Sequence, residues 1–79
     1  MTPAQCRAAR ALLGITQSQL ARAAKLGLST VVDFEKERRF VSNEAVKAIQ
    51  TALQRAGVEF MEENGGGEGL LLRKRQKRI

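Results

Sequence analysis

The stretch TQSQLARAAKLGLSTVVDFEKERR, residues 16–39, decides the fold. It predicts one short helix over 17–24 and a second over 28–36, with only three residues between them. Thr16 is a favourable N-cap for the first helix, and Gly27 is an acceptable N-cap for the second. Two short helices joined by so tight a turn must cross steeply.

This steep crossing is the helix-turn-helix arrangement, and its second helix has two dissimilar faces. Helical spacing places Val31 and Phe34 on one side, where they are the expected core anchors. The other side, which is expected to be exposed, carries Leu28, Ser29, Val32, Asp33 and Lys36. An ordinary solvent face would carry long charged side chains. This mixture of short polar and small apolar groups instead suits a DNA major groove.

Two longer helices are predicted around this pair, over Pro3–Leu13 and Asn43–Ala56. Each follows a hydroxyl N-cap, Thr2 or Ser42, and each precedes a glycine that can stop it. The sole cysteine, Cys6, is predicted to pack in the core as a small apolar side chain. These patterns predict a mainly α fold, a compact bundle of four helices.

The C-terminal part of the chain differs from the helical part. Residues 58–61 and 70–73 are predicted as the two arms of a β-hairpin around a glycine-rich turn. The sequence therefore divides into a DNA-binding domain over 1–57, a hairpin or dimerisation segment over 58–73, and a basic flexible tail over 74–79.

Composition excludes several classes of function. The 79 residues include no histidine and one cysteine, so histidine zinc sites and serine–histidine pairs are excluded. With no glycine-rich phosphate loop either, the sequence predicts no enzyme, no metal, no cofactor and no small-molecule ligand. No apolar run approaches the roughly 18 residues of a membrane span, so no membrane partner is expected. The net charge of +6 indicates an anionic partner.

Several residues at fixed offsets resemble those of a known family. They are Gly14, Gln17, Leu20, Ala21, Val31, Phe34 and Glu35, with basic residues just after. Over residues 3 to about 56 the chain resembles the helix-turn-helix of the phage repressor and Cro superfamily, the xenobiotic-response-element (XRE) type. The resemblance implies a lambda repressor-like DNA-binding fold.

The resemblance also implies roles for matched positions. The positions implied to contact phosphate at the start of the first short helix are Thr16 and Gln17. Those implied to face base edges are Leu28, Ser29 and Asp33, and those implied to follow the DNA backbone are Lys36, Arg38 and Arg39. Arg10 and Glu35 match a family ion pair that ties the first helix to the recognition helix. The chain departs from the family at Lys25 and Glu37, where glycine is usual.

Physical reasoning agrees with these roles. Basic residues beside the recognition helix can supply the affinity for phosphate, so the helix itself is free to select bases. Asp33 can accept a hydrogen bond from a cytosine amino group, and Leu28 or Val32 can meet a thymine methyl. The alternative, that Asp33 merely solubilises the helix, stays open.

A second copy of the chain is the expected protein partner, because one helix-turn-helix touches few base pairs. The predicted dimerisation residues alternate along the hairpin arms and are Val58, Phe60, Leu70 and Leu72. Strand pairing between two chains would cover the free strand edges. The alternative is a hairpin that folds back on its own fourth helix.

The sequence thus predicts a sequence-specific double-stranded DNA-binding transcription regulator, a repressor or an activator, that acts as a homodimer on a palindromic operator. A bacterial or mobile-element source and a cytoplasmic, nucleoid-associated location are expected. Two other classes stay open. One is an antiactivator or antitoxin that sequesters a protein partner, and the other is a non-specific nucleic-acid coating protein.

Overall fold

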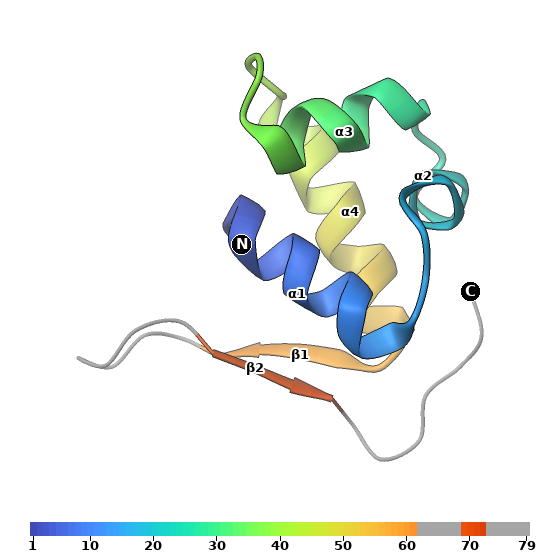
Figure 1. Ribbon diagram of the computed structural model, residues 1–79, viewed down its shortest axis with the longest axis vertical. Helices are drawn as coiled ribbons and strands as arrows, with labels where there is room; N and C mark the ends of the chain where they lie inside the picture. The colour runs from blue at the N-terminus through green and yellow to red at the C-terminus, as the bar shows by residue number, and fades with distance from the viewer. Residues whose placement is uncertain (62–68, 73–79) are drawn as a thin grey trace.

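The computed structural model describes residues 1–61 and 69–72 of the chain. These residues form four helices followed by a two-stranded antiparallel sheet (Figure 1). The elements are α1 (Pro3–Leu13), α2 (Gln17–Ala24), α3 (Leu28–Lys36), α4 (Asn43–Arg55), β1 (Val58–Met61) and β2 (Gly69–Leu72). The predicted mainly α fold is confirmed. The glycine-rich turn predicted over 64–69 lies outside the described residues except for Gly69, which begins β2, and the basic tail over 74–79 also lies outside them.

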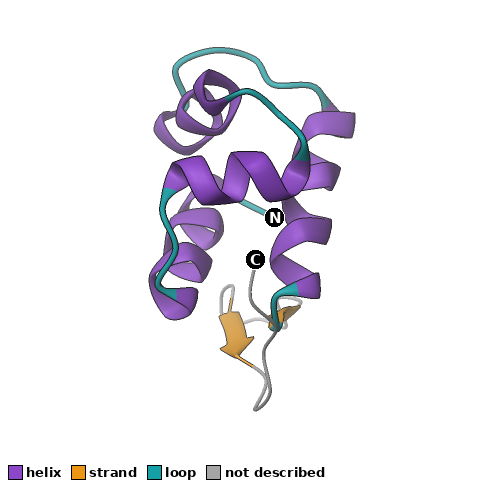
Figure 2. Ribbon diagram, turned by 90° about the vertical axis from the view of Figure 1, so that its right-hand side faces the viewer, coloured by secondary structure: helices purple, strands orange, loops and turns teal. Residues whose placement is uncertain are grey.

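The α3 helix and the hairpin lie at opposite ends of the molecule. In Figure 1, α2 is seen nearly end-on while α3 lies across the view, so these consecutive helices cross steeply, as the tight turn predicted. The α4 helix runs behind α1 and reaches from the neighbourhood of α3 to the hairpin. The second view confirms this separation of α3 from the hairpin (Figure 2).

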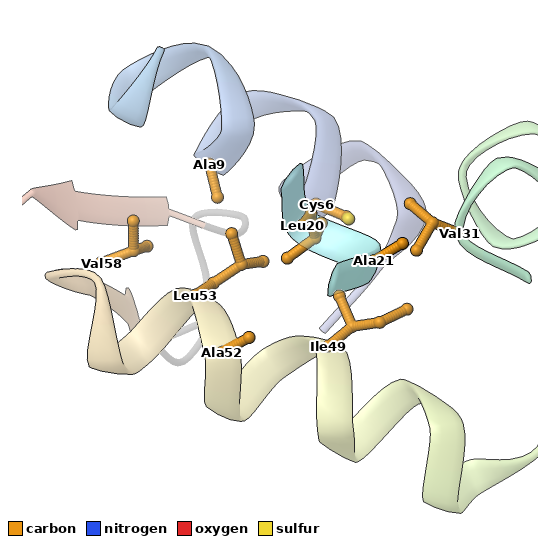
Figure 3. Packing of buried hydrophobic residues seen from close by; sticks show 9 residues of the cluster. All are labelled: Cys6, Ala9, Leu20, Ala21, Val31, Ile49, Ala52, Leu53 and Val58. Atoms are coloured by element: carbon orange, nitrogen blue, oxygen red, sulfur yellow. The ribbon is translucent and has the colours of Figure 1, made fainter. Parts of the chain in front are cut away.

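One core joins all four helices to β1 (Figure 3). Its buried members are Cys6, Ala9, Leu20, Ala21, Val31, Ile49, Ala52, Leu53 and Val58. Several are alanines, whose small side chains let neighbouring helices approach closely. The predicted anchors Val31, Ile49 and Leu53 are all 0% exposed, so the helical patterns identified the core faces correctly.

Hydroxyl side chains begin three of the four helices, as predicted. Thr2 and Thr16 each accept a hydrogen bond from the backbone N–H three residues later, where Gln5 and Gln19 stand. The two glutamine side chains accept hydrogen bonds in return from the cap N–H groups, which completes both capping boxes. Ser42 caps α4 in the same way, with a bond of 3.1 Å. Each bond satisfies a donor that a helix start leaves without an intrahelical acceptor.

Three helices end in a residue with left-handed backbone conformation. These residues are Gly14 (φ 70°), Lys25 (φ 60°) and Glu37 (φ 54°). Beyond α3, the Arg38 N–H donates to the carbonyl oxygen of Asp33 at 3.0 Å, which closes the end of the helix and reverses the chain. Lys25 and Glu37 stand where glycine is common in the family that the sequence resembles. Both positions need the conformation that glycine adopts without strain.

Replacing Glu37 by glycine is therefore expected to stabilise the fold, by roughly 0.5–1 kcal/mol. The substitution removes the strain between Cβ and the following carbonyl, which exceeds the extra backbone entropy of the unfolded chain. Lys25→Gly should act in the same direction. Lys36→Gly, inside α3, is the matched control and should destabilise the protein. Urea unfolding of the three variants checks this, and an equal loss at Glu37 and Lys36 would contradict the explanation.

The C-terminal boundaries differ slightly from the predicted ones. α4 ends at Arg55 rather than Ala56, because the Ala56 N–H is shared between the carbonyls of Ala52 and Leu53 in a tightened last turn. β2 begins at Gly69, one residue before the predicted Leu70, while the predicted last residue of this arm, Arg73, lies outside the described residues. The start of β2 is set by pairing with β1, a long-range property that the local pattern does not contain.

The hairpin lies against its own helices, with β1 beside α4 and β2 beside α1. Val58 is 2% exposed and belongs to the core, and Phe60 packs against that core. This is the arrangement that the sequence analysis kept as the alternative to strand exchange. The side chain of Val58 is therefore not available to a second chain. A dimer role for β1 would rest on its backbone edge.

Candidate nucleic-acid interface

The α3 helix buries one face and exposes the other, as its pattern predicted. Val31 is 0% exposed and Phe34 is partly buried against the core. On the other face, Leu28 is 47% exposed, and Ser29 and Lys36 are also exposed. Val32 and Asp33 lie between these extremes. Four of these five side chains are short, so a flat or grooved surface can approach the backbone of α3 closely at its N-terminal end.

A buried carboxylate fixes α3 to the two preceding helices. The Glu35 side chain is 1% exposed, and its two oxygens accept from Arg10 Nε at 2.7 Å and Arg10 Nη2 at 2.9 Å. Gln17 Nε2 also donates to Glu35, at 2.9 Å, and Cys6 Sγ donates at 3.2 Å. The structure thus contains the Arg10–Glu35 ion pair that the resemblance implied. Two further hydrogen-bond donors to the Glu35 carboxylate are Cys6 of α1 and Gln17 of α2.

The pKa values of the Glu35 cluster follow from this geometry. Burial acts to raise the pKa of Glu35, but hydrogen bonds from Arg10, Gln17 and Cys6, with the Arg10 charge, hold it below its usual value. The hydrogen bond to Glu35 in turn raises the pKa of Arg10. Burial, and then the hydrogen bond to Glu35, raise the pKa of the Cys6 thiol. The carboxylate therefore stays ionised while the thiol stays protonated and donates.

Sequence reasoning missed two members of this cluster. Cys6 was interpreted only as an apolar core residue, although its buried thiol also donates to Glu35. Arg7 was not singled out, yet its Nη1 donates to the backbone carbonyl of Glu35, near the end of α3. A signal was present, since Arg7 lies three residues before Arg10 and so near it on the surface of α1.

The structure turns Gln17 towards the protein. Its side chain is partly buried and donates to Glu35, although the resemblance implied a phosphate contact. Thr16 is exposed, but its hydroxyl oxygen accepts the N–H of Gln19 as the cap of α2. Both residues remain at the N-terminus of α2, where free N–H groups and partial positive charge favour an anion.

Asp33 has two basic neighbours that the sequence analysis did not pair with it. Arg38 Nε lies 3.5 Å from Asp33 Oδ1, and Arg39 Nε lies 3.6 Å from Asp33 Oδ2. The reversal of the chain at Glu37 brings the two arginines back beside the helix they follow. Their side chains remain 57% and 76% exposed, whereas that of Asp33 is 16% exposed. The three residues that the resemblance assigned to DNA thus lie together at one end of α3.

A surface hollow of about 330 Å³ lies between α3 and the start of α4. It is lined by Ser29, Thr30 and Asp33 of α3 and by Arg39 and Phe40 of the following loop. Phe40, which sequence reasoning did not single out, is 87% exposed. The hollow therefore brings together predicted base-reading residues, a predicted backbone-binding arginine and an exposed aromatic ring.

Within the described residues, no helix is long and apolar enough to cross a membrane. The same part of the chain holds no group of three histidine, cysteine, aspartate or glutamate side chains arranged to bind a metal ion.

A steeply crossed pair α2–α3, an exposed short-chain face on α3 and a basic loop after it define a helix-turn-helix DNA-binding protein. A family model described as helix-turn-helix matches residues 7–60, more than half of the chain. The chain belongs to this helix-turn-helix family, of the XRE type, and is a DNA-binding transcription regulator in kind. Comparison with curated proteins gave no match.

Proposed function

We propose that the protein is a sequence-specific regulator that binds a palindromic operator as a homodimer, and represses or activates transcription from it. The observation that carries this proposal is the exposed face of α3 in a chain of the helix-turn-helix family. Leu28, Ser29 and Lys36 are exposed there, with Val32 and Asp33 beside them. A helix inserted in the major groove reads bases through such side chains.

Residues on either side of the exposed face of α3 are placed to contact the phosphate groups of DNA. The N-terminus of α2, beside Thr16 and Gln17, offers the backbone N–H groups of its first turn to phosphate, since the Gln17 amide donates to Glu35. Lys36, Arg38 and Arg39, at the other end of α3, supply positive charge where the DNA backbone would pass. Phosphate contacts of this kind provide affinity and register, while the base contacts of α3 provide selection.

Selection of bound sequences from random duplex DNA tests the proposal. An enriched palindrome with two similar half-sites, about one or more helical turns apart, is the expected result. Enrichment of no sequence, with equal binding of all duplexes, would favour the non-specific coating protein. Absence of DNA binding, with capture of a protein partner, would favour the antiactivator or antitoxin.

The proposed homodimer is supported by the small size of the sheet in the described part of the chain. Among the described residues the sheet has two strands, so each strand has one edge that pairs with no other strand there. In the register observed, Val58 lies opposite Leu72 and Phe60 opposite Leu70. An exposed strand edge is a template for pairing with another chain, and a lone hairpin is marginally stable in water. We infer that β2, whose strand is leucine-rich, pairs with β2 of the second copy.

Deletion of residues 62–79 is expected to convert the dimer to a monomer. This deletion removes β2 but keeps Val58 and Phe60, which the core needs. Sedimentation equilibrium measures the change. A second deletion, of residues 74–79 alone, is the matched control: it removes basic residues, keeps β2 and should leave the dimer intact. A dimer that survives loss of 62–79 would move the interface to the helices, and a monomeric full-length chain would reject the homodimer.

A further inference from the structure

An exposed phenylalanine stands at the end of the molecule that carries α3. Phe40 lies in the loop between α3 and α4 and is 87% exposed, more than Leu12 (45%) or Leu28 (47%). This loop is at the end opposite the hairpin (Figure 1). Exposure of a large aromatic side chain costs free energy in water, so a complex in which another surface covers Phe40 would be stabilised.

The chemistry around Phe40 selects one kind of covering surface. Arg38 and Arg39 precede it directly, and both side chains are more than half exposed. A second copy of this chain, docked on the same loop, would bring two more arginines against these two. A DNA strand instead brings a phosphate for each guanidinium and a deoxyribose whose apolar C–H groups can pack on a phenyl ring.

The position of Phe40 agrees with that choice. It lines the same hollow as Arg39, and Ser29 and Asp33 of α3 line that hollow too. A strand whose bases face Ser29 and whose phosphate meets Arg39 therefore passes beside the ring.

We propose that Phe40 is a DNA-contacting residue that packs against the deoxyribose of the strand held by Arg39. This inference rests on the proposed function and adds to it an apolar, sequence-independent contact. A phosphate contact releases counterions and so depends on salt, whereas an apolar contact does not. The two kinds of contact can therefore be separated by titration at several salt concentrations.

The test uses the full chain, a duplex enriched by selection and a scrambled duplex, with fluorescence anisotropy in several NaCl concentrations. Phe40→Ala should weaken binding to both duplexes by roughly 10-fold, with an unchanged dependence on salt. Arg39→Ala should instead reduce the slope of the salt dependence by about one. Phe40→Leu should recover part of the affinity. Leu12→Ala, an apolar truncation on exposed α1, is the matched control and should bind like the wild type.

Other outcomes have distinct meanings. Wild-type DNA affinity in Phe40→Ala overturns the inference. A loss of affinity that occurs only at low salt also overturns it, because Phe40 would then act by positioning Arg38 and Arg39 rather than by contacting DNA. Loss of the dimer in Phe40→Ala, seen by sedimentation, also overturns it, because the ring would then contact the second copy. A wild-type protein that binds neither duplex rejects the proposed function, and the inference with it.

Discussion

Replacing Arg10 by methionine is expected to lower the free energy of unfolding by about 2–4 kcal/mol. Methionine fills a similar volume, but the Glu35 carboxylate, with 1% of its side chain exposed, loses the two hydrogen bonds from Arg10 and its compensating charge. DNA binding should also weaken, although no DNA contact is removed, because Glu35 fixes α3 to α1 and α2. Arg22→Met, at an exposed position of α2, is the matched control and should change stability by less than about 0.5 kcal/mol.

A double-mutant cycle isolates the pair. Combining Arg10→Met with Glu35→Leu should recover part of the loss, because no carboxylate is then left buried without its partner. Thermal and urea unfolding of the four proteins provide the measurement. Simple additivity of the two single changes would mean that the side chains do not interact in solution.

The same variants should differ in their dependence on pH. In the wild type the pKa of Glu35 is lowered, so its contribution to stability is complete above the usual carboxyl range and is lost as pH falls through the folded pKa. In Arg10→Met, burial would dominate and raise that pKa, so protonation would favour the folded state. The difference in stability between the two proteins should therefore shrink between about pH 7 and pH 4. A difference that stays constant over this range would mean that the loss of Arg10 does not change the protonation of Glu35.

Asp33→Ala is expected to reduce the discrimination between operator and scrambled duplex by ~1–3 kcal/mol, if Asp33 accepts from a base. The structure adds a second effect, because Asp33 lies 3.5 Å from Arg38 Nε and 3.6 Å from Arg39 Nε. Removing the carboxylate frees both guanidinium groups for phosphate. Affinity for the scrambled duplex should therefore rise while the preference between duplexes falls.

Two matched variants separate these effects. Arg38→Ala should weaken binding to both duplexes and lower the slope of the salt dependence by about one. Glu37→Gln removes a negative charge from the same loop without changing the contacts of Asp33. If Asp33→Ala tightened both duplexes equally, as Glu37→Gln is expected to, then Asp33 would act only as a nearby charge. Base reading would then be assigned to Leu28, Ser29 and Val32.

The elements of the fold could be predicted from the sequence because their signals are local. Thr2, Thr16 and Ser42 marked helix starts, and Gly14 marked a helix end, so the bounds of α1, α2 and α3 were predicted correctly. The start of β2 was predicted one residue too late, because Gly69 enters the strand through its pairing with Met61 of β1. The direction in which the hairpin packs was left open for the same reason.

The candidate site was predicted only in part. Resemblance supplied the Arg10–Glu35 pair, whereas the contacts of Asp33 with Arg38 and Arg39 arise from the chain reversal at Glu37. A helical wheel describes only residues within the helix. It therefore does not show that the reversed chain places Arg38 and Arg39 beside Asp33. The role of each residue in DNA binding remains a prediction for the experiments above.

The burial of Cys6 has a practical consequence. Its thiol is 0% exposed and sits between α1 and the carboxylate of Glu35, so a thiol reagent reaches it only when those helices separate. Because Cys6 is the single cysteine of the chain, its labelling rate reports that opening without any engineered probe. The labelling rate of Cys6 therefore measures how often α3 separates from the rest of the domain.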